Sequence, residues 1–226
     1  MADGEKLTAY SCGGSRGIAP RSLFTPSPGH RRRQSLAIQG RLCNGANLWW
    51  RATGPVMATA SLTLILGGAR SGKSRHGEGL IEALPGPWTY IATAQAWDDE
   101  MQARIAEHRA RRSPDWLTVD APLALAAAIA ATPPGRPILV DCLTLWLTNL
   151  MLAEQDTQAG CADLLRACAG RAGPIVLVAS EVGLGIVPEN ALARRFRDEA
   201  GRLHQRLAAQ ADRVVFMVAG LPMQVK

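Results

Sequence analysis

The stretch LTLILGGARSGKS, residues 62–74, decides the fold. Apolar and β-branched residues lead into Gly67, four residues separate it from Gly72, and Lys73 and Ser74 open a helical segment. This is the P-loop pattern in the strand–loop–helix order that supports it. Its glycines let backbone N–H groups turn inward around phosphates, and the helix N-terminus adds positive potential. The stretch therefore predicts a nucleoside triphosphate site; the alternative is a glycine-rich turn that binds nothing.

From Ser61 onward, short apolar runs alternate with longer segments of helical period. The expected strands are 62–66, 89–93, 137–141, 174–180 and 213–218, and the expected helices are 73–83, 98–111, 122–130, 143–153, 162–170 and 191–211. Buried strands that alternate with helices form a mostly parallel sheet with helices on both faces. The prediction is a single α/β domain of the P-loop NTPase type over residues 57–226.

Residues 1–56 differ in composition from the rest of the chain. They hold eight basic and two acidic residues, which accounts for the whole net charge of +6. The segment is rich in Gly, Ser, Pro and Arg without a hydrophobic period, so we expect a disordered basic leader or a non-native extension upstream of Met57. Organelle targeting and a partner-binding arm are the alternatives.

Composition also bounds the setting of the protein. No run approaches the roughly 18 apolar residues of a membrane-spanning helix, so we expect no membrane span. The five cysteines form no CxxC pair, which disfavours a disulfide framework or a zinc site and favours a reducing, cytoplasmic setting. Because the chain after residue 56 is neutral, the basic leader gives no argument for nucleic-acid binding by the domain.

Acidic residues at the ends of expected strands are candidates for a Mg²⁺ site. Lys73 would reach the β- and γ-phosphates, and the Ser74 hydroxyl would ligate Mg²⁺. Asp141 ends the run PILVD, where a Walker-B carboxylate stands, although it can instead cap the next helix. Glu181 ends the run IVLVASE and is a possible catalytic or metal-organising residue.

One histidine has neighbours suited to phosphate chemistry. His108 lies in the polar segment DDEMQARIAEHRARR, residues 98–112, among several arginines. Arginines can hold phosphates, and a neutral imidazole can attack an α-phosphate as a covalent nucleophile. The alternative is a solvated helix face without a function.

These segments together resemble the bifunctional adenosylcobinamide kinase/adenosylcobinamide-phosphate guanylyltransferases of cobalamin biosynthesis. The matching strings are GGARSGKSRH at 67–76, YIAT at 90–93, DDEMQARIAEHRARR at 98–112, DCLTLWLTNL at 141–150 and EVGLGIVPENALARRFRDEAGRLHQRLAAQAD at 181–212. Many families share a P-loop, whereas the combination of these strings is far more specific. The resemblance begins near Leu62 and does not cover the leader.

The resemblance implies two reactions on one scaffold. ATP or GTP phosphorylates the hydroxyl of the aminopropanol arm of adenosylcobinamide. GTP then guanylylates a histidine with release of pyrophosphate, and the GMP passes to adenosylcobinamide phosphate to give adenosylcobinamide-GDP. It also implies a homotrimer with a RecA-like fold, and a mobile helix carrying the guanylylated histidine.

The resemblance assigns that histidine to His108, which follows Glu107 where some relatives carry a second histidine. It assigns nucleotide contacts to seventeen residues: Gly67, Gly68, Ala69, Arg70, Ser71, Gly72, Lys73, Ser74, Ala92, Thr93, Ala94, Arg109, Ala110, Arg111, Arg112, Asp120 and Asp141. Two other functions remain as alternatives. One is a small-molecule P-loop kinase with a single activity; the other is a RecA-like ATPase or nucleic-acid-binding module, which the neutral domain disfavours.

Overall fold

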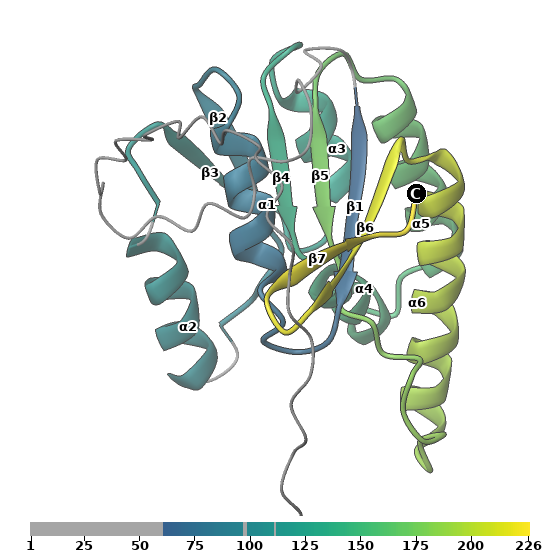
Figure 1. The fold of residues 1–226 in the computed structure, drawn as a ribbon. Helices are drawn as coiled ribbons and strands as arrows, with labels where there is room; N and C mark the ends of the chain where they lie inside the picture. The colour runs from purple at the N-terminus through teal and green to yellow at the C-terminus, as the bar shows by residue number, and fades with distance from the viewer. Residues whose placement is uncertain (1–60, 97–98, 111) are drawn as a thin grey trace, which may run out of the picture. The chain divides into compact units, whose positions relative to one another are not determined.

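The computed structural model describes residues 61–96, 99–110 and 112–226 (Figure 1). The predicted leader, residues 1–56, lies outside this part of the chain, so its character stays a prediction. Over the described residues, no helix is both long enough and apolar enough to cross a bilayer.

Seven strands of the described chain form one sheet in the order β3-β2-β4-β5-β1-β6-β7 (Figure 1). The strands are β1 (Leu62–Gly67), β2 (Trp88–Ala92), β3 (Trp116–Asp120), β4 (Ile138–Asp141), β5 (Ile175–Val178), β6 (Arg213–Val218) and β7 (Leu221–Gln224). Every neighbouring pair is parallel except β6 and β7. The predicted mostly parallel sheet is therefore confirmed.

The six expected helices are all present among the described residues. They are α1 (Lys73–Glu82), α2 (Asp99–Ala110), α3 (Leu125–Ala131), α4 (Leu143–Leu152), α5 (Thr157–Ala169) and α6 (Ala191–Gln210). The largest error is at α5, which begins at Thr157 rather than at residue 162. The reason is a cap: the Asp156 carboxylate accepts hydrogen bonds from the backbone N–H groups of Gln158 and Ala159.

Strands β3 and β7 were not expected from the sequence. Both are edge strands with little apolar surface to bury: only Trp116 is buried in β3, and every residue of β7 is exposed. β7 also contains Pro222, which is tolerated at a sheet edge. A tight turn at Ala219 and Gly220, with φ values of 50° and 82°, folds β7 back onto β6.

Helices cover both faces of the sheet, as predicted. One core cluster joins α1 to one face through Ile65, Ile81 and Val176, and the other joins α3, α4, α5 and α6 to the opposite face. On α1, a Cβ at Gly77 would lie 2.9 Å from a methyl carbon of Leu139 on β4. Helix α1 therefore leaves β1 and passes close to β4, whose last residue is Asp141.

The Arg171 side chain fastens the segment between α3 and β4. Its guanidinium donates to four backbone carbonyl oxygens at 2.6–3.2 Å, those of Ile129, Thr132, Pro133 and Arg136. Three of these carbonyls follow or end α3, where orphan carbonyls need donors.

Replacing Arg171 by alanine should lower the free energy of unfolding by about 2–3 kcal/mol, because partly buried carbonyls lose their donor. Urea unfolding measures this change. The matched control is Arg166→Ala on α5, whose exposed ion pair with Asp163 is expected to contribute less than about 0.5 kcal/mol. Equal losses in the two variants would contradict this account of Arg171.

Candidate active site

The P-loop requires glycine at its start and at the entry to α1. A Cβ at Gly67, the last residue of β1, would lie 2.6 Å from the Met217 carbonyl oxygen, and its φ is 150°. Gly72, the N-cap of α1, has a φ of 93°, a region that L-residues rarely adopt. The strand–loop–helix context predicted for residues 67–74 is therefore present.

Lys73 and Ser74 occupy the first turn of α1. The Lys73 side chain is buried, and its Nζ donates to the Gly68 carbonyl oxygen at 2.6 Å. The ammonium is thus held against the loop, where phosphate oxygens would be bound. Ser74 is half-buried in the next position of the helix.

The loop has a support that the sequence did not indicate. The Gly220 N–H, in the turn between β6 and β7, donates to the Ser71 carbonyl oxygen at 3.1 Å. The Ser71 Oγ is buried and has no hydrogen-bond partner within the described residues. The C-terminal hairpin therefore braces the P-loop from the side opposite to β5.

Asp141 ends β4, and its carboxylate is not the cap of the following helix. The N-cap of α4 is Cys142, without a side-chain cap bond, so the capping alternative for Asp141 is wrong. Instead, its Oδ2 accepts a hydrogen bond from the Tyr90 hydroxyl at 2.9 Å. Val178 of β5 pairs with both Ile65 and Asp141, which places β5 between the P-loop strand and the carboxylate.

Glu181 lies directly beside the start of the P-loop. Its N–H donates to the Gly67 carbonyl oxygen at 2.9 Å, and its Oε1 accepts from the Gly183 N–H at 2.5 Å. Its Oε2 lies 4.0 Å from Nδ1 of His204, a buried residue of α6 that the sequence did not single out. The backbone contact brings Glu181 to the site, as its strand-end position suggested.

The residues after β2 are held by side chains rather than free to bind a ligand. The Thr93 hydroxyl donates to the Cys142 carbonyl oxygen at 2.7 Å and accepts from the Cys142 N–H at 2.8 Å. Asn149, buried in α4, donates its amide to the carbonyl oxygens of Thr93 at 2.8 Å and Pro122 at 3.0 Å. The Thr93 N–H also donates to the Asp141 carbonyl oxygen at 3.3 Å, so the hydroxyl and both backbone groups of Thr93 already have partners within the protein. The predicted nucleotide contacts at Ala92, Thr93 and Ala94 stay predictions.

The sequence did not indicate that Asn149 is a positioning residue, although it lies in the matching string DCLTLWLTNL at 141–150. Its signal was an amide side chain inside an otherwise apolar helix. Because a buried amide needs partners, such a residue points to backbone groups that it satisfies.

The end of α2 lies against the edge of the sheet. Nη2 of Arg109 lies 3.1 and 3.2 Å from the two carboxylate oxygens of Asp120, which ends β3. Cζ of Arg112 lies 3.6 Å from the centre of the Tyr90 ring. Arg111 and the side chain of His108 lie outside the described residues, and Ala110 is exposed. Two predicted nucleotide ligands, Arg109 and Asp120, are thus paired with each other.

The donor set suits Mg²⁺. Ser74 and Asp141 offer a hydroxyl and a carboxylate, and Mg²⁺ prefers oxygen ligands with one or two from the protein and the rest from phosphates and water. No cluster of three or more Asp, Glu, His or Cys side chains able to hold a metal occurs in the described chain. The residues therefore fit an ion that arrives with a nucleotide.

Burial shifts several pKa values near the site. Desolvation and the nearby Asp141 carboxylate raise the pKa of Tyr90 well above its usual range, so its hydroxyl stays a donor. Burial raises the pKa of the Cys142 thiol to about 11. Desolvation lowers the pKa of His76 and of His204, although Glu181 partly opposes the shift at His204.

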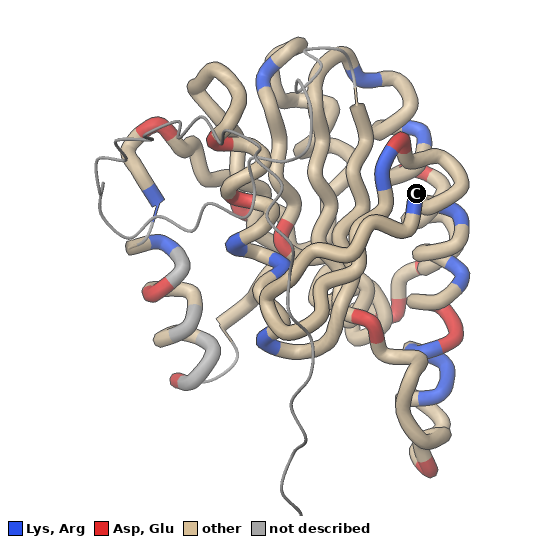
Figure 2. The backbone as a smooth tube through the Cα atoms, in the orientation of Figure 1, with Lys and Arg blue, Asp and Glu red and all other residues tan. Residues whose placement is uncertain are grey.

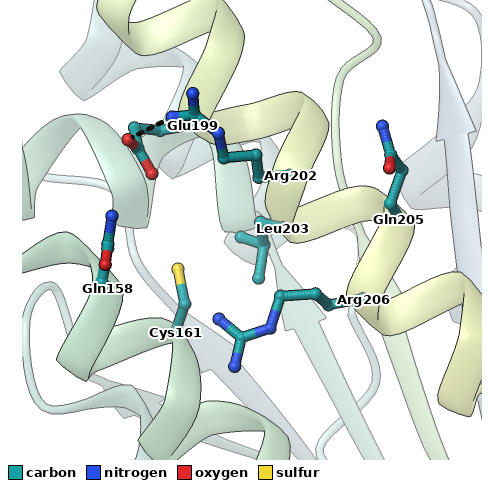
Figure 3. A pocket seen from close by; sticks show the side chains of 7 residues that line it. All are labelled: Gln158, Cys161, Glu199, Arg202, Leu203, Gln205 and Arg206. Atoms are coloured by element: carbon teal, nitrogen blue, oxygen red, sulfur yellow. Dashed lines mark hydrogen bonds and ion pairs between the residues drawn. The ribbon is translucent and has the colours of Figure 1, made fainter.

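A cavity of about 350 Å³ lies between α5 and α6 (Figure 3). Its lining includes Cys161 and the ion pair of Arg202 with Glu199. No residue predicted to bind nucleotide contributes to it. Helix α6 carries five arginines and two acidic residues, Asp198 and Glu199, so positive charge predominates along it (Figure 2).

The P-loop follows β1, and the acidic residue Asp141 ends β4, with β5 between these two strands. This arrangement defines a P-loop nucleotide-binding α/β enzyme.

The family follows from the comparison with known proteins. The CobU family model, described as cobinamide kinase / cobinamide phosphate guanyltransferase, matches residues 63–225. The bifunctional adenosylcobalamin biosynthesis protein CobP of Pseudomonas aeruginosa is 55% identical over 166 residues, 72% of this chain and 96% of the relative. CobU of Salmonella typhimurium is 44% identical over 181 residues, 73% of this chain and 99% of the relative. The chain belongs to the CobU family, and the resemblance drawn from its motifs is confirmed.

Solved structures give more distant likenesses. The flagellar accessory protein FlaH of Methanocaldococcus jannaschii aligns with a TM-score of 0.43 and 14% identity, over 74% of this chain and 79% of that one. An ATPase of a bacterial type III secretion system aligns with a TM-score of 0.47 and 11% identity, over 74% and 57%. Likeness at this level carries no argument about activity or site.

Changing Asn149 to Asp should destabilise the protein by about 3 kcal/mol, because two carbonyl oxygens would face an acceptor instead of a donor. The control is the same substitution at Asn190, the N-cap of α6, where an Asp side chain caps equally well. Urea unfolding of both variants measures the difference. Similar losses at the two positions would refute the role given to Asn149.

Stability should fall as the pH drops below about 6.5. Because burial lowers the pKa of His204 in the folded state, the unfolded chain binds more protons there, and the free energy of unfolding rises with pH through this window. Unfolding at about pH 7.5 and about pH 5.5 measures the slope. His204→Asn should flatten it; an unchanged slope would assign the effect to other groups, His76 first among them.

Proposed function

We propose that one phosphate site, built on residues 67–74, serves both reactions of this enzyme. The chain is a bifunctional cobinamide kinase and cobinamide phosphate guanylyltransferase of cobalamin biosynthesis, as its family is. The observation that carries the single-site proposal is the position of Lys73, buried at the entry to α1 with its ammonium against the loop. The chain offers this P-loop at one strand end, and both reactions begin with a bound triphosphate.

In the kinase reaction, the hydroxyl of the aminopropanol arm of adenosylcobinamide attacks the γ-phosphorus of ATP or GTP. The bond between the γ-phosphorus and the bridging oxygen breaks, the diphosphate leaves, and the hydroxyl proton passes to solvent or to a base. Lys73 neutralises charge on the β- and γ-phosphates. We propose Glu181 as a catalytic or metal-organising residue that would accept that proton, since its backbone N–H bonds the Gly67 carbonyl oxygen at the start of the P-loop.

In the transferase reaction, a ring nitrogen of neutral His108 attacks the α-phosphorus of GTP, and pyrophosphate leaves. A phosphate oxygen of adenosylcobinamide phosphate then attacks the guanylyl phosphorus, the bond from phosphorus to nitrogen breaks, and the imidazole is restored. The product is adenosylcobinamide-GDP. Splitting the transfer in this way replaces one difficult displacement by two easier ones.

The packing of α2 supports a helix that can bring His108 to the nucleotide. Among its described side chains, Ile105 is half-buried and the others are exposed. The described side chains of α2 therefore bury little apolar surface, which supports a helix that moves at a small cost in hydrophobic free energy. The arginines near its end supply charge for phosphates.

We propose Mg²⁺ as the cofactor, with the Ser74 hydroxyl and the Asp141 carboxylate as its protein ligands. When bound with a triphosphate, the ion neutralises phosphate charge. The protein holds the two oxygen ligands in place, Ser74 on α1 and Asp141 at the end of β4.

We propose that the protein acts as a cytoplasmic homotrimer without a nucleic-acid partner. Several large apolar side chains of the described chain are exposed, which supports self-association; they include Leu184, Ile186 and Val187 before α6, and Leu221 and Met223 in β7. The number of three subunits rests on the resemblance alone. Free thiols at Cys142, Cys161 and Cys168 suit a reducing compartment.

Incubation with GTP labelled at the α-phosphate should leave acid-labile label on the chain, and His108→Ala should abolish it while leaving the kinase reaction. The matched control is Gln102→Ala, an exposed residue of the same helix, which should retain the label. A wild-type protein that phosphorylates cobinamide but never acquires label would overturn the covalent step.

A further inference from the structure

We propose that Tyr90 is a positioning residue that ties the metal-binding carboxylate of Asp141 to the end of helix α2. The inference rests on the proposed function of the site and adds a residue to it. Tyr90 stands in the middle of β2 and is 4% exposed. Different parts of its side chain contact two residues that are predicted to bind the nucleotide. The hydroxyl engages Asp141 of β4, and the ring engages Arg112 beyond α2.

The hydroxyl fixes the rotation of the carboxylate. Tyr90 Oη donates to Asp141 Oδ2 at 2.9 Å. The bond therefore fixes the orientation of the Asp141 carboxylate at the end of β4.

The ring is held so that one face is available to a cation. Trp116 packs edge-on against Tyr90, with ring centres 6.0 Å apart and an angle of 81° between the planes. Trp116 is itself fixed, because its Nε1 donates to Glu82 Oε1 on α1 at 3.0 Å. Against the Tyr90 face lies the Arg112 guanidinium, 3.6 Å from the ring centre, a cation–π contact.

Arg112 is the part of this arrangement that points to a ligand. Its Nη1 is buried and has no hydrogen-bond partner in the part of the chain that is described. A buried guanidinium donor without an acceptor is unfavourable, and phosphate oxygens are the acceptors that this group prefers. The Arg112 N–H also donates to the Arg109 carbonyl oxygen at 3.3 Å, so the position of its side chain is coupled to the end of α2.

Among the described residues, Arg109 also joins this end of α2 to the sheet. The pair of Arg109 with Asp120 is more than half exposed on both sides, so solvent screens it. The contact of Arg112 with Tyr90 is shielded from water, which strengthens it by comparison. Through these two contacts, Tyr90 fixes the position of the end of α2, the helix that carries His108, relative to the Asp141 carboxylate.

The first test separates the hydroxyl from the ring. In Tyr90→Phe the ring still packs on Trp116 and Arg112, but Asp141 loses its donor. Binding of non-hydrolysable GTP is measured by calorimetry with Mg²⁺ and with EDTA. The affinity in EDTA should match wild type within about twofold, while the gain in affinity from Mg²⁺ should fall roughly tenfold.

The second test removes the ring. Tyr90→Leu should also weaken binding in EDTA and slow the appearance of α-phosphate label on the chain roughly tenfold, because Arg112 and α2 lose their support. Trp88→Phe is the control: Trp88 lies on the same strand and packs on Trp116, with ring centres 5.3 Å apart. It should bind nucleotide and acquire label as wild type does.

The outcomes distinguish this inference from the proposed function. If the wild type acquires no label, the covalent step fails whatever Tyr90 does. If the wild type is labelled and Tyr90→Phe keeps the full gain in affinity from Mg²⁺, Tyr90 only fills space and the inference is overturned. Should Tyr90→Leu not fold, as judged by circular dichroism, the Phe variant decides by itself.

Discussion

The parallel pairing of β1 with β5, and of β5 with β4, is the constraint on which the site depends. Parallel strands end at one edge of a sheet, so their last residues meet there although they are far apart in the chain. Val178 of β5 pairs with both Ile65 and Asp141, so Asp141 lies at the same height in the sheet as the last residues of β1, where the P-loop begins. If these strands slipped by one residue, Asp141 would point to the opposite face, toward α4 rather than α1.

Helix α1 converts this register into a binding site. It crosses β5 toward β4 because Gly77 permits a contact with Leu139 that any side chain would disturb. The helix thereby carries Ser74 in the direction of Asp141, and its N-terminus directs unpaired N–H groups at the loop. Buried Lys73 is tolerated there since it donates to the Gly68 carbonyl oxygen, and bound phosphate would add the countercharge.

The sequence predicted the elements with strong local signals and missed those that depend on pairing. A glycine pattern between a strand and a helix has one structural solution, so the site at Lys73 could be predicted. The edge strand β7 has no periodicity to detect, and its support of Ser71 through Gly220 depends on a long-range contact. Periodicity also could not show that Tyr90 reaches Asp141, because neighbouring strands in the sheet are not neighbours in sequence.

The same distinction between anchored and weakly packed elements supports the proposal that one site serves both reactions. The parts that hold the phosphates are anchored in the sheet, where burial and hydrogen bonds make displacement costly. The described side chains of α2 are mostly exposed, so the proposed movement of this helix would leave the loop in place. A movable nucleophile still needs a defined stopping point, since misplacement by an ångström slows a reaction greatly. We infer that the contact of Arg112 with the Tyr90 ring defines the position of α2 in which the nucleophile reacts. The hydrogen bond of Tyr90 to Asp141 relates that position to the phosphate site.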